Sequence, residues 1–217
     1  MLDTDNNTLQ NLRKDYQNTR TIQPNKDPFS EFQIWFNEAL NNNEDEPNVM
    51  TLATVDSHNM PYTRIVLLKD LKNQKFTFFT NYKSSKAKHI EQNNNVSLTF
   101  WWQKISRAVH IQGKAQKTST EESNKYFNSR PKANKIGAIV SKQSSIINNL
   151  DDLINEAKII NEKYKDDHLI PKPDHWGGYE VDPCKIEFWK GLPGRLHERI
   201  RYDLNKNGLW TIQQLAP

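Results

Sequence analysis

The sequence predicts a mainly β protein with helical additions, of the α+β class, whose strands form an antiparallel barrel. Roughly seven short segments alternate apolar and polar side chains as strands do. Turn sequences at 56–59 and 206–208 join neighbouring strands closely enough for antiparallel hairpins. Most helical patterns are inserted late in the chain. Because closing such a sheet removes its exposed edges, a barrel is the favoured arrangement.

The first 27 residues are polar and have almost nothing to bury, which predicts a flexible N-terminal arm over 1–27. A helix is predicted to begin at Asp27 and Pro28, because aspartate caps helices and proline suits the first turn. One side of this helix carries Phe29, Phe32, Trp35, Phe36, Ala39 and Leu40. That apolar stripe predicts core packing.

The spacing of apolar residues then changes to the period of strands. Predicted strands cover 49–55, 62–69, 76–81, 96–102 and 107–115, and two more flank the turn at 206–208. Alternation along 62–69 places Arg64 and Lys69 on different faces, as two surface ends of one strand. We expect a single domain over 28–217.

Helices are predicted at three further places. Ser84 precedes a short one, Ser119 and Glu122 match a capping box before a helical pair broken at Pro131, and 151–164 is a long amphipathic segment. Trp176-Gly177-Gly178 predicts tight packing against a buried indole.

Composition narrows the functional classes. The 217 residues carry a net charge of +4, which is compatible with anionic partners without choosing among them. Cys184 is the only cysteine, so an internal disulfide is impossible and a thiolate metal cluster is implausible. With neither a signal peptide nor a membrane span in the pattern, we expect a cytoplasmic protein.

The segment around 186–199 has the strongest functional pattern. It contains Trp189, Arg195, His197 and Arg199, an indole, an imidazole and two guanidiniums within about a dozen positions. These groups suit planar, anionic ligands. The segment therefore predicts a binding site.

Three weaker patterns leave alternatives open. The helix start at 84–88 can cradle a phosphate or be an ordinary capped helix. Tyr126 and Arg130 lie one helical turn apart and can clamp a phosphate or form a solvated pair. The donors at 143–145 can address a polar ring edge, but capping of the next segment is the preferred interpretation.

Several motif classes are absent from the sequence. It has no GxGxxG, P-loop or GxSxG pattern and no HExxH-like spacing of histidines. Dinucleotide, nucleoside-triphosphate and α/β-hydrolase functions are therefore excluded, and no metal is expected.

Eight motifs in order give the chain its resemblance to a known family. They are Arg64-Ile65-Val66-Leu67-Leu68-Lys69, Phe79-Thr80-Asn81, Lys86-Ala87, Tyr126-Phe127-Asn128-Ser129-Arg130-Pro131, Ser141-Lys142-Gln143-Ser144-Ser145, Trp176-Gly177-Gly178, Ile186-Glu187-Phe188-Trp189 and Arg195-Leu196-His197-Glu198-Arg199. Together they resemble the pyridoxine/pyridoxamine 5'-phosphate oxidases. The similarity runs from about Arg13 to the last residue.

This resemblance implies an FMN-binding split barrel that works as a homodimer, with the flavin between subunits. The implied FMN contacts are Arg64, Ile65, Val66, Leu67, Leu68, Lys69, Phe79, Thr80, Lys86, Gln143, Ser144, Trp189 and Arg199. The implied substrate contacts are Arg13, Lys14, Asp15, Tyr16, Lys69, Tyr126, Arg130, Asn134, Arg195, Leu196 and His197. Among these, Arg195 and His197 are the implied catalytic residues.

The implied reaction converts pyridoxamine or pyridoxine 5'-phosphate to pyridoxal 5'-phosphate. FMN supplies the redox chemistry, and O2 reoxidises it with release of H2O2. The residues 13–16 are expected to close over bound ligand. No nucleic acid or membrane is expected as a partner.

The chain departs from the family pattern at three positions. Ser85 stands where the family usually has an arginine, Ala108 where a glutamine is common, and Asn134 where a serine helps to hold the substrate phosphate. The first two departures favour an alternative, a non-catalytic flavin- or pyridoxal-phosphate-binding protein. A second rival, a single-stranded nucleic-acid binder, is motivated by the six tryptophans among basic strands.

Overall fold

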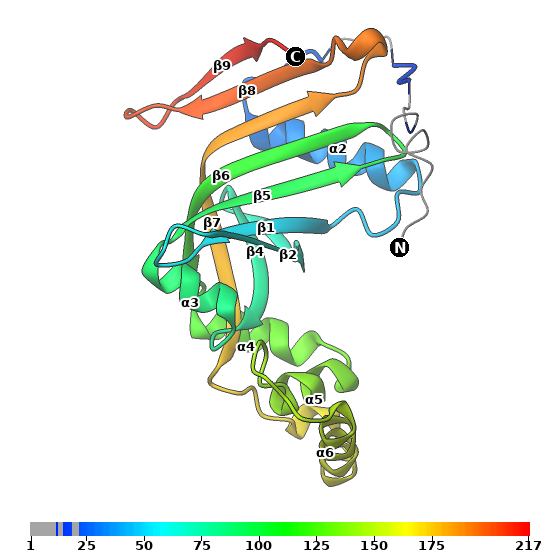
Figure 1. Ribbon diagram of the computed structural model, residues 1–217, viewed down its shortest axis with the longest axis vertical. Helices are drawn as coiled ribbons and strands as arrows, with labels where there is room; N and C mark the ends of the chain where they lie inside the picture. Colours follow the sequence, from blue (N-terminus) through cyan, green and yellow to red (C-terminus); the bar gives the residue numbers. More distant parts are fainter. Residues whose placement is uncertain (1–11, 13–14, 19–21) are drawn as a thin grey trace, which may run out of the picture. The chain divides into compact units, whose positions relative to one another are not determined.

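The computed structural model describes residues 12, 15–18 and 22–217 of the chain. Its helices are α2 (Pro28–Asn41), α3 (Ser85–Gln92), α4 (Thr120–Ser129), α5 (Lys132–Val140) and α6 (Leu150–Lys163), with short 3-10 turns at Asp167–Leu169 and Pro193–Arg195 (Figure 1). Its strands are β1 (Val49–Val55), β2 (Pro61–Leu67), β3 (Asp70–Lys72), β4 (Lys75–Asn81), β5 (Asn95–Trp102), β6 (Arg107–Lys117), β7 (Trp176–Lys190), β8 (Glu198–Leu204) and β9 (Trp210–Leu215). The predicted α+β class is confirmed.

The strands form one sheet in the order β2-β1-β5-β6-β7-β4-β3, to which β8 adds beside β7 and β9 beside β8. The registered pairs, such as β1 with β2 and β7 with β8, are antiparallel. The predicted antiparallel sheet is therefore confirmed. None of the helices in the described part of the chain has the length and apolar character to span a membrane.

Contacts divide the chain into two compact units. The first comprises the described residues up to Pro47 with Trp101–His110 and Lys185–Pro217, and the second comprises Asn48–Phe100 and Ile111–Cys184. The sequence-based division into an arm and a single domain stays a prediction.

In the first unit, α2 begins where the sequence predicts. The Asp27 carboxylate accepts hydrogen bonds from the backbone N–H groups of Phe29 and Ser30, at 3.3 and 2.9 Å. This cap satisfies donors that would otherwise lack partners at the helix start. Trp35 is buried and meets the ring of Phe188 edge-on, with centroids 5.1 Å apart. The core role of the stripe is confirmed.

One residue of the predicted stripe does not belong to that core. Leu40, near the end of α2, is 49% exposed. Leu40 therefore lies outside the buried face of the helix, whereas Ala39 beside it is fully buried.

In the second unit, the inserted helices form their own apolar cluster. The Ser119 side chain accepts from the backbone N–H of Glu122 at 3.1 Å, and Pro131 separates α4 from α5. Both predictions are confirmed. The buried residues of the cluster are Phe127, Ile136, Ala138, Val140, Ile170 and Trp176.

Gly177 and Gly178, at the start of β7, are required because neighbouring side chains approach their backbone closely. A Cβ on Gly178 would lie 2.8 Å from Phe79 and 2.7 Å from the Thr118 hydroxyl, and one on Gly177 would overlap the Tyr82 ring. The predicted tight packing is confirmed, although the rings that need the space belong to Phe79 and Tyr82.

The end of β2 differs from the prediction. The strand stops at Leu67, and the N–H of Lys69 instead donates to Thr77 on β4 at 2.8 Å. The alternation used for the sequence prediction therefore ends before Lys69. Arg64 and Lys69 line the same cavity, so their placement on different faces was wrong.

Candidate functional site

The second unit contains a cavity of about 710 Å3. Its lining residues are Arg64, Ile65, Val66, Leu67, Lys69, Phe79, Thr80, Asn81, Ser85, Lys86, Tyr126, Arg130, Ala133, Asn134, Gly137, Ala138, Ser141, Gln143, Ser144 and Trp176. They come from β2, β4, α3, α4 and α5, from the loops that follow β2, α4 and α5, and from the first residue of β7. The volume lies in the range of small-molecule sites.

Lys86 supplies a buried cation to this cavity from the first turn of α3. Its Nζ donates to Thr80 Oγ1 at 3.1 Å, to Ser84 Oγ at 3.3 Å and to Gln143 Oε1 at 3.1 Å. These acceptors are uncharged. Burial, followed by the positive charge of Arg64, lowers the pKa of Lys86 to about 8.

Arg64 supplies a second cation from β2. Its Nη1 donates to Thr54 Oγ1 at 2.7 Å and to the carbonyl oxygens of Leu52 and Tyr62, both at 3.1 Å. Burial lowers its pKa. Among the described residues, neither Arg64 nor Lys86 forms an ion pair with a carboxylate, so this part of the cavity favours an anion.

Flat rings make another part of the lining. Phe79 stacks on Tyr126 with centroids 4.0 Å apart and on Trp176 with centroids 5.4 Å apart. The guanidinium of Arg130 lies 4.6 Å from the centroid of Trp176. Such a cation–ring contact fixes the guanidinium plane while leaving its edge available for hydrogen bonds.

Arg130 retains unused hydrogen-bonding capacity. Its Nη1 is buried and has no hydrogen-bond partner among the described residues. A buried donor without a partner is costly, and a bound anion would remove that cost. The interpretation of Tyr126 and Arg130 as a merely solvated pair is therefore wrong.

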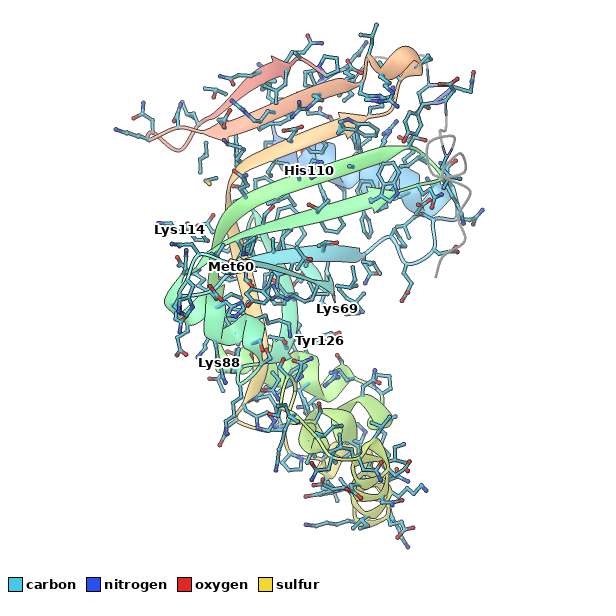
Figure 2. The ribbon with its side chains drawn as sticks, in the orientation of Figure 1. Met60, Lys69, Lys88, His110, Lys114 and Tyr126 are labelled. Atoms are coloured by element: carbon cyan, nitrogen blue, oxygen red, sulfur yellow. The ribbon has the colours of Figure 1, made fainter. Side chains whose placement is uncertain are left out.

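Burial raises the pKa of the Tyr126 phenol, while nearby Arg130 lowers it. The net shift is upward, so the phenol keeps its proton at neutral pH and can donate. Lys69 and Tyr126, labelled in Figure 2, line this cavity and also a smaller one of about 240 Å3.

Gln143 corrects a preferred sequence interpretation. Its side-chain oxygen accepts from Lys86 and from the Thr80 hydroxyl at 3.2 Å, whereas the next helix is capped by Asn149. Capping by 143–145 was therefore wrong. Ser144 has a positive φ of 72° and also lines the cavity.

Some lining residues were missed by the sequence interpretation. Asn81 donates from its side chain to the Ser141 carbonyl at 3.2 Å, which ties β4 to the end of α5. Trp176 was assigned to packing only. The small residues Ala133, Gly137 and Ala138 were also missed, because small side chains carry no distinctive chemistry in a sequence.

The first unit holds the aromatic cluster predicted near the C-terminus. Trp189 and His197 have ring centroids 4.7 Å apart, and Tyr16 meets both rings edge-on at 5.7 and 5.6 Å. A Cβ on Gly191 would lie 2.6 Å from the Tyr16 ring, so only glycine admits this contact. Tyr16 thus packs against Trp189 and His197, two residues that the family resemblance also assigns to the binding site.

The hydrogen bonds of this cluster fix its proton arrangement. The backbone N–H of Leu192 donates to His197 Nδ1 at 3.2 Å. Nδ1 is therefore an acceptor, and the proton of the neutral ring is on Nε2. Arg199 instead pairs with Glu187 at 2.7 Å, and this hydrogen bond raises its pKa.

The other predicted residues occupy simpler positions. Arg195 and Leu196 are exposed, and Arg195 has a positive φ of 62°. Leu68 is buried and does not line the cavity. Asp15 is exposed, whereas Arg13 and Lys14 lie outside the described residues.

Comparisons with known families match both parts of the chain. Residues 36–154 match the model of pyridoxamine 5'-phosphate oxidase, and residues 176–217 match that of the pyridoxine 5'-phosphate oxidase C-terminal dimerisation region. Among solved structures, PhzG from Burkholderia lata 383, crystallised with tetrahydrophenazine-1-carboxylic acid, has a TM-score of 0.85 at 24% identity, covering 90% of this chain and 95% of that one. A pyridoxamine 5'-phosphate oxidase-related, FMN-binding protein from Nostoc punctiforme PCC 73102 has a TM-score of 0.69 at 15% identity, covering 86% and 97%. These likenesses confirm the split-barrel fold.

Curated relatives are more similar in sequence. A pyridoxine/pyridoxamine 5'-phosphate oxidase from Gloeothece citriformis is 42% identical over 97% of this chain and 99% of its own length. Its counterpart from Leptospira biflexa is 47% identical over 88% of this chain and 89% of its own. The chain therefore belongs to the pyridoxine/pyridoxamine 5'-phosphate oxidase family of oxidoreductases.

Proposed function

We propose that this protein is an FMN-dependent oxidase that converts pyridoxamine 5'-phosphate or pyridoxine 5'-phosphate to pyridoxal 5'-phosphate, with O2 as acceptor and H2O2 as second product. The observation that carries the proposal is the cavity of the second unit. Among the described residues, four cations line it without an acidic partner: Arg64, Lys69, Lys86 and Arg130. That excess of positive charge suits ligands with phosphate groups.

The residues of this cavity fit FMN. Lys86 has only neutral acceptors, and Arg64 uses Nη1 for protein contacts while Nε and Nη2 have no recorded partner among the described residues. These two groups would hold the FMN phosphate. The other FMN contacts proposed in the second unit are Ile65, Val66, Leu67, Lys69, Phe79, Thr80, Gln143 and Ser144. Trp189 and Arg199 are proposed to complete the FMN site.

The substrate phosphate is proposed to meet Lys69, Tyr126, Arg130 and Asn134. Arg130 brings the buried Nη1 donor that lacks a partner among the described residues, and Tyr126 brings a protonated phenol. A planar guanidinium can bind a phosphate through two parallel hydrogen bonds. The phosphate would thereby set the register of the whole substrate in the site.

Arg195 and His197 are proposed to contact the reacting part of the substrate. Because His197 Nδ1 accepts from Leu192, its Nε2–H is the group that can donate to a ligand. The guanidinium of exposed Arg195 would position and polarise the substrate. Leu196 and the arm residues Arg13, Lys14, Asp15 and Tyr16 are proposed to cover the bound ligand and exclude water.

When bound, FMN would accept a hydride from the substrate carbon that carries the amine or hydroxyl. Loss of the hydride and a proton gives the aldehyde directly from the alcohol, whereas the amine gives an imine that water hydrolyses to the aldehyde and ammonia. The contribution of this chain is orientation, which brings that carbon to the reacting distance. No covalent protein nucleophile is required. FMN is proposed to lie between the subunits of a homodimer.

An absorbance spectrum followed by a peroxide assay tests this function. The purified protein should be yellow, or become yellow with added FMN, and should produce equal amounts of pyridoxal 5'-phosphate and H2O2 from pyridoxamine 5'-phosphate. A protein that binds no flavin would overturn the proposal.

Ser85 lines the cavity at a position where the family usually has an arginine. This departure favours a second candidate function, that of a non-catalytic flavin-binding protein. A non-catalytic flavin-binding protein would be yellow but would form neither product from either phosphorylated vitamer. The same assay therefore decides between the two functions.

A further inference from the structure

The guanidinium of Arg64 is held by the protein through only one of its three nitrogen atoms. All three recorded hydrogen bonds use Nη1, which carries two of the five N–H donors. Two of the acceptors are the backbone carbonyls of Leu52 and Tyr62, and the third is the side chain of Thr54. Only the third can be altered by mutation without changing the backbone, and it is also the shortest, at 2.7 Å.

Thr54 lies at the centre of a short chain of hydrogen bonds. It is 1% exposed on β1, so its hydroxyl needs partners within the protein. Its Oγ1 accepts from Arg64 and lies 3.1 Å from His89 Nδ1. An arginine cannot accept a hydrogen bond, so the single hydroxyl hydrogen is directed to Nδ1. Nδ1 is then the acceptor, and the His89 proton is on Nε2.

His89 is itself held in place. It lies in the last turn of α3, and the Tyr62 ring packs against it with centroids 4.8 Å apart. Lys86 lies in the first turn of the same helix and lines the cavity. A single short helix therefore bears one cavity cation directly and supports the other through Thr54.

We propose that Thr54 and His89 are positioning residues for the cofactor phosphate, acting through Arg64. His89 orients the Thr54 hydroxyl, and the Thr54 oxygen holds Nη1, so that Nε and Nη2 remain directed to the ligand. This inference rests on the proposed function, because the ligand phosphate is that of FMN.

Thr54→Val tests the proposal, because valine keeps the shape of threonine and removes the hydroxyl. Affinities of the apo-protein for FMN and for riboflavin, which lacks the phosphate, are measured by fluorescence titration. Thr54→Val should weaken FMN binding about tenfold and leave riboflavin binding unchanged, since a hydrogen bond to a charged group is involved. Thr54→Ser, which restores the hydroxyl, should recover FMN affinity.

A second pair of variants tests the hydrogen bond between His89 and Thr54. These variants also keep the proposal testable if Thr54→Val does not fold. His89→Asn keeps an acceptor near the position of Nδ1 and should bind FMN like the original protein, whereas His89→Leu removes it and should weaken FMN selectively. His58→Leu is the matched control, because His58 is exposed in the β1–β2 turn. It should bind both flavins normally.

The outcomes separate the two claims. If Thr54→Val and His89→Leu weaken FMN and riboflavin equally, or weaken neither, the positioning role is overturned while the proposed function stands. If the unaltered protein binds no FMN, the proposed function itself fails.

Discussion

Lys86 is the residue whose protonation is most directly tied to ligand binding. Burial, with the charge of Arg64, lowers its pKa to about 8, so it loses its proton as the pH rises through that value. A bound phosphate dianion favours the protonated lysine. FMN affinity of the apo-protein should therefore fall by up to about tenfold per pH unit above 8. Titration of the apo-protein with FMN between pH 7 and about 9.5 measures this fall in affinity.

Riboflavin is the control for this pH dependence, because it has no phosphate to sense the charge of Lys86. Its affinity should stay constant over the same range. An FMN affinity that is equally constant would remove Lys86 from the phosphate site.

Arg130 gives a second prediction at the residue scale. Arg130→Ala should raise KM for pyridoxamine 5'-phosphate by roughly 10- to 100-fold, since a hydrogen bond to a charged group is lost. kcat should change much less, because the phosphate is remote from the reacting carbon. Steady-state kinetics of the variant measure both constants.

Lys158→Ala, on the exposed part of α6, removes a positive charge elsewhere and should leave KM unchanged. An Arg130→Ala enzyme with the original KM would show that the buried Nη1 donor has another purpose.

Sequence patterns located these residues unevenly. Trp189 and His197 were identified because aromatic and cationic groups cluster in one segment, and the structure brings their rings together. Gln143 was assigned to capping because its partner, Lys86, lies 57 positions away. A contact between remote segments leaves no local pattern.

At the scale of elements, the cap of α2 makes the clearest prediction. Asp27→Ala removes the carboxylate that accepts from Phe29 and Ser30. The free energy of unfolding should fall by about 0.5–2 kcal/mol, which is typical for loss of an N-cap. Urea unfolding followed by circular dichroism measures the change.

The neighbouring exposed residue provides the comparison for Asp27. Lys26→Ala alters a side chain outside the helix and should leave the unfolding midpoint nearly unchanged. Equal stability of the two variants would mean that the cap contributes nothing measurable.

Elements with a strong local pattern were predicted well, and those set by pairing were not. The start of α2 and the break at Pro131 follow from local backbone chemistry. In contrast, β3 has three residues and exists because Asp70–Lys72 pairs with β4. The 15-residue strand β7 was not predicted as a continuous strand, because Pro183 and the polar residues near it interrupt the apolar pattern.

At the scale of the whole molecule, the family match over residues 176–217 is to a dimerisation region. Sedimentation equilibrium should therefore give twice the mass of one chain. If FMN lies between subunits, dilution that separates the dimer should release it. A monomer that keeps FMN at every concentration would contradict this placement.

Fold and family could be inferred from sequence because eight motifs occur in order. The proposed roles of individual residues depend on bound ligands. At Ser85 and Ala108 the sequence does not show whether other hydrogen-bond donors replace the side chains that the family usually has there. Ser85 lines the cavity close in sequence to buried Lys86. Ala108 is buried in the first unit. The affinity of the apo-protein for FMN measures the effect of these two departures.

The proposed function requires the same protein to bind FMN and to oxidise a phosphorylated vitamer with it. The most direct measurement is the flavin absorbance after anaerobic mixing of the FMN-loaded protein with pyridoxamine 5'-phosphate. The flavin band should bleach, return when O2 is admitted, and stay unchanged with pyridoxamine that lacks the phosphate at the same concentration. A band that remains oxidised with the phosphorylated substrate would contradict the account.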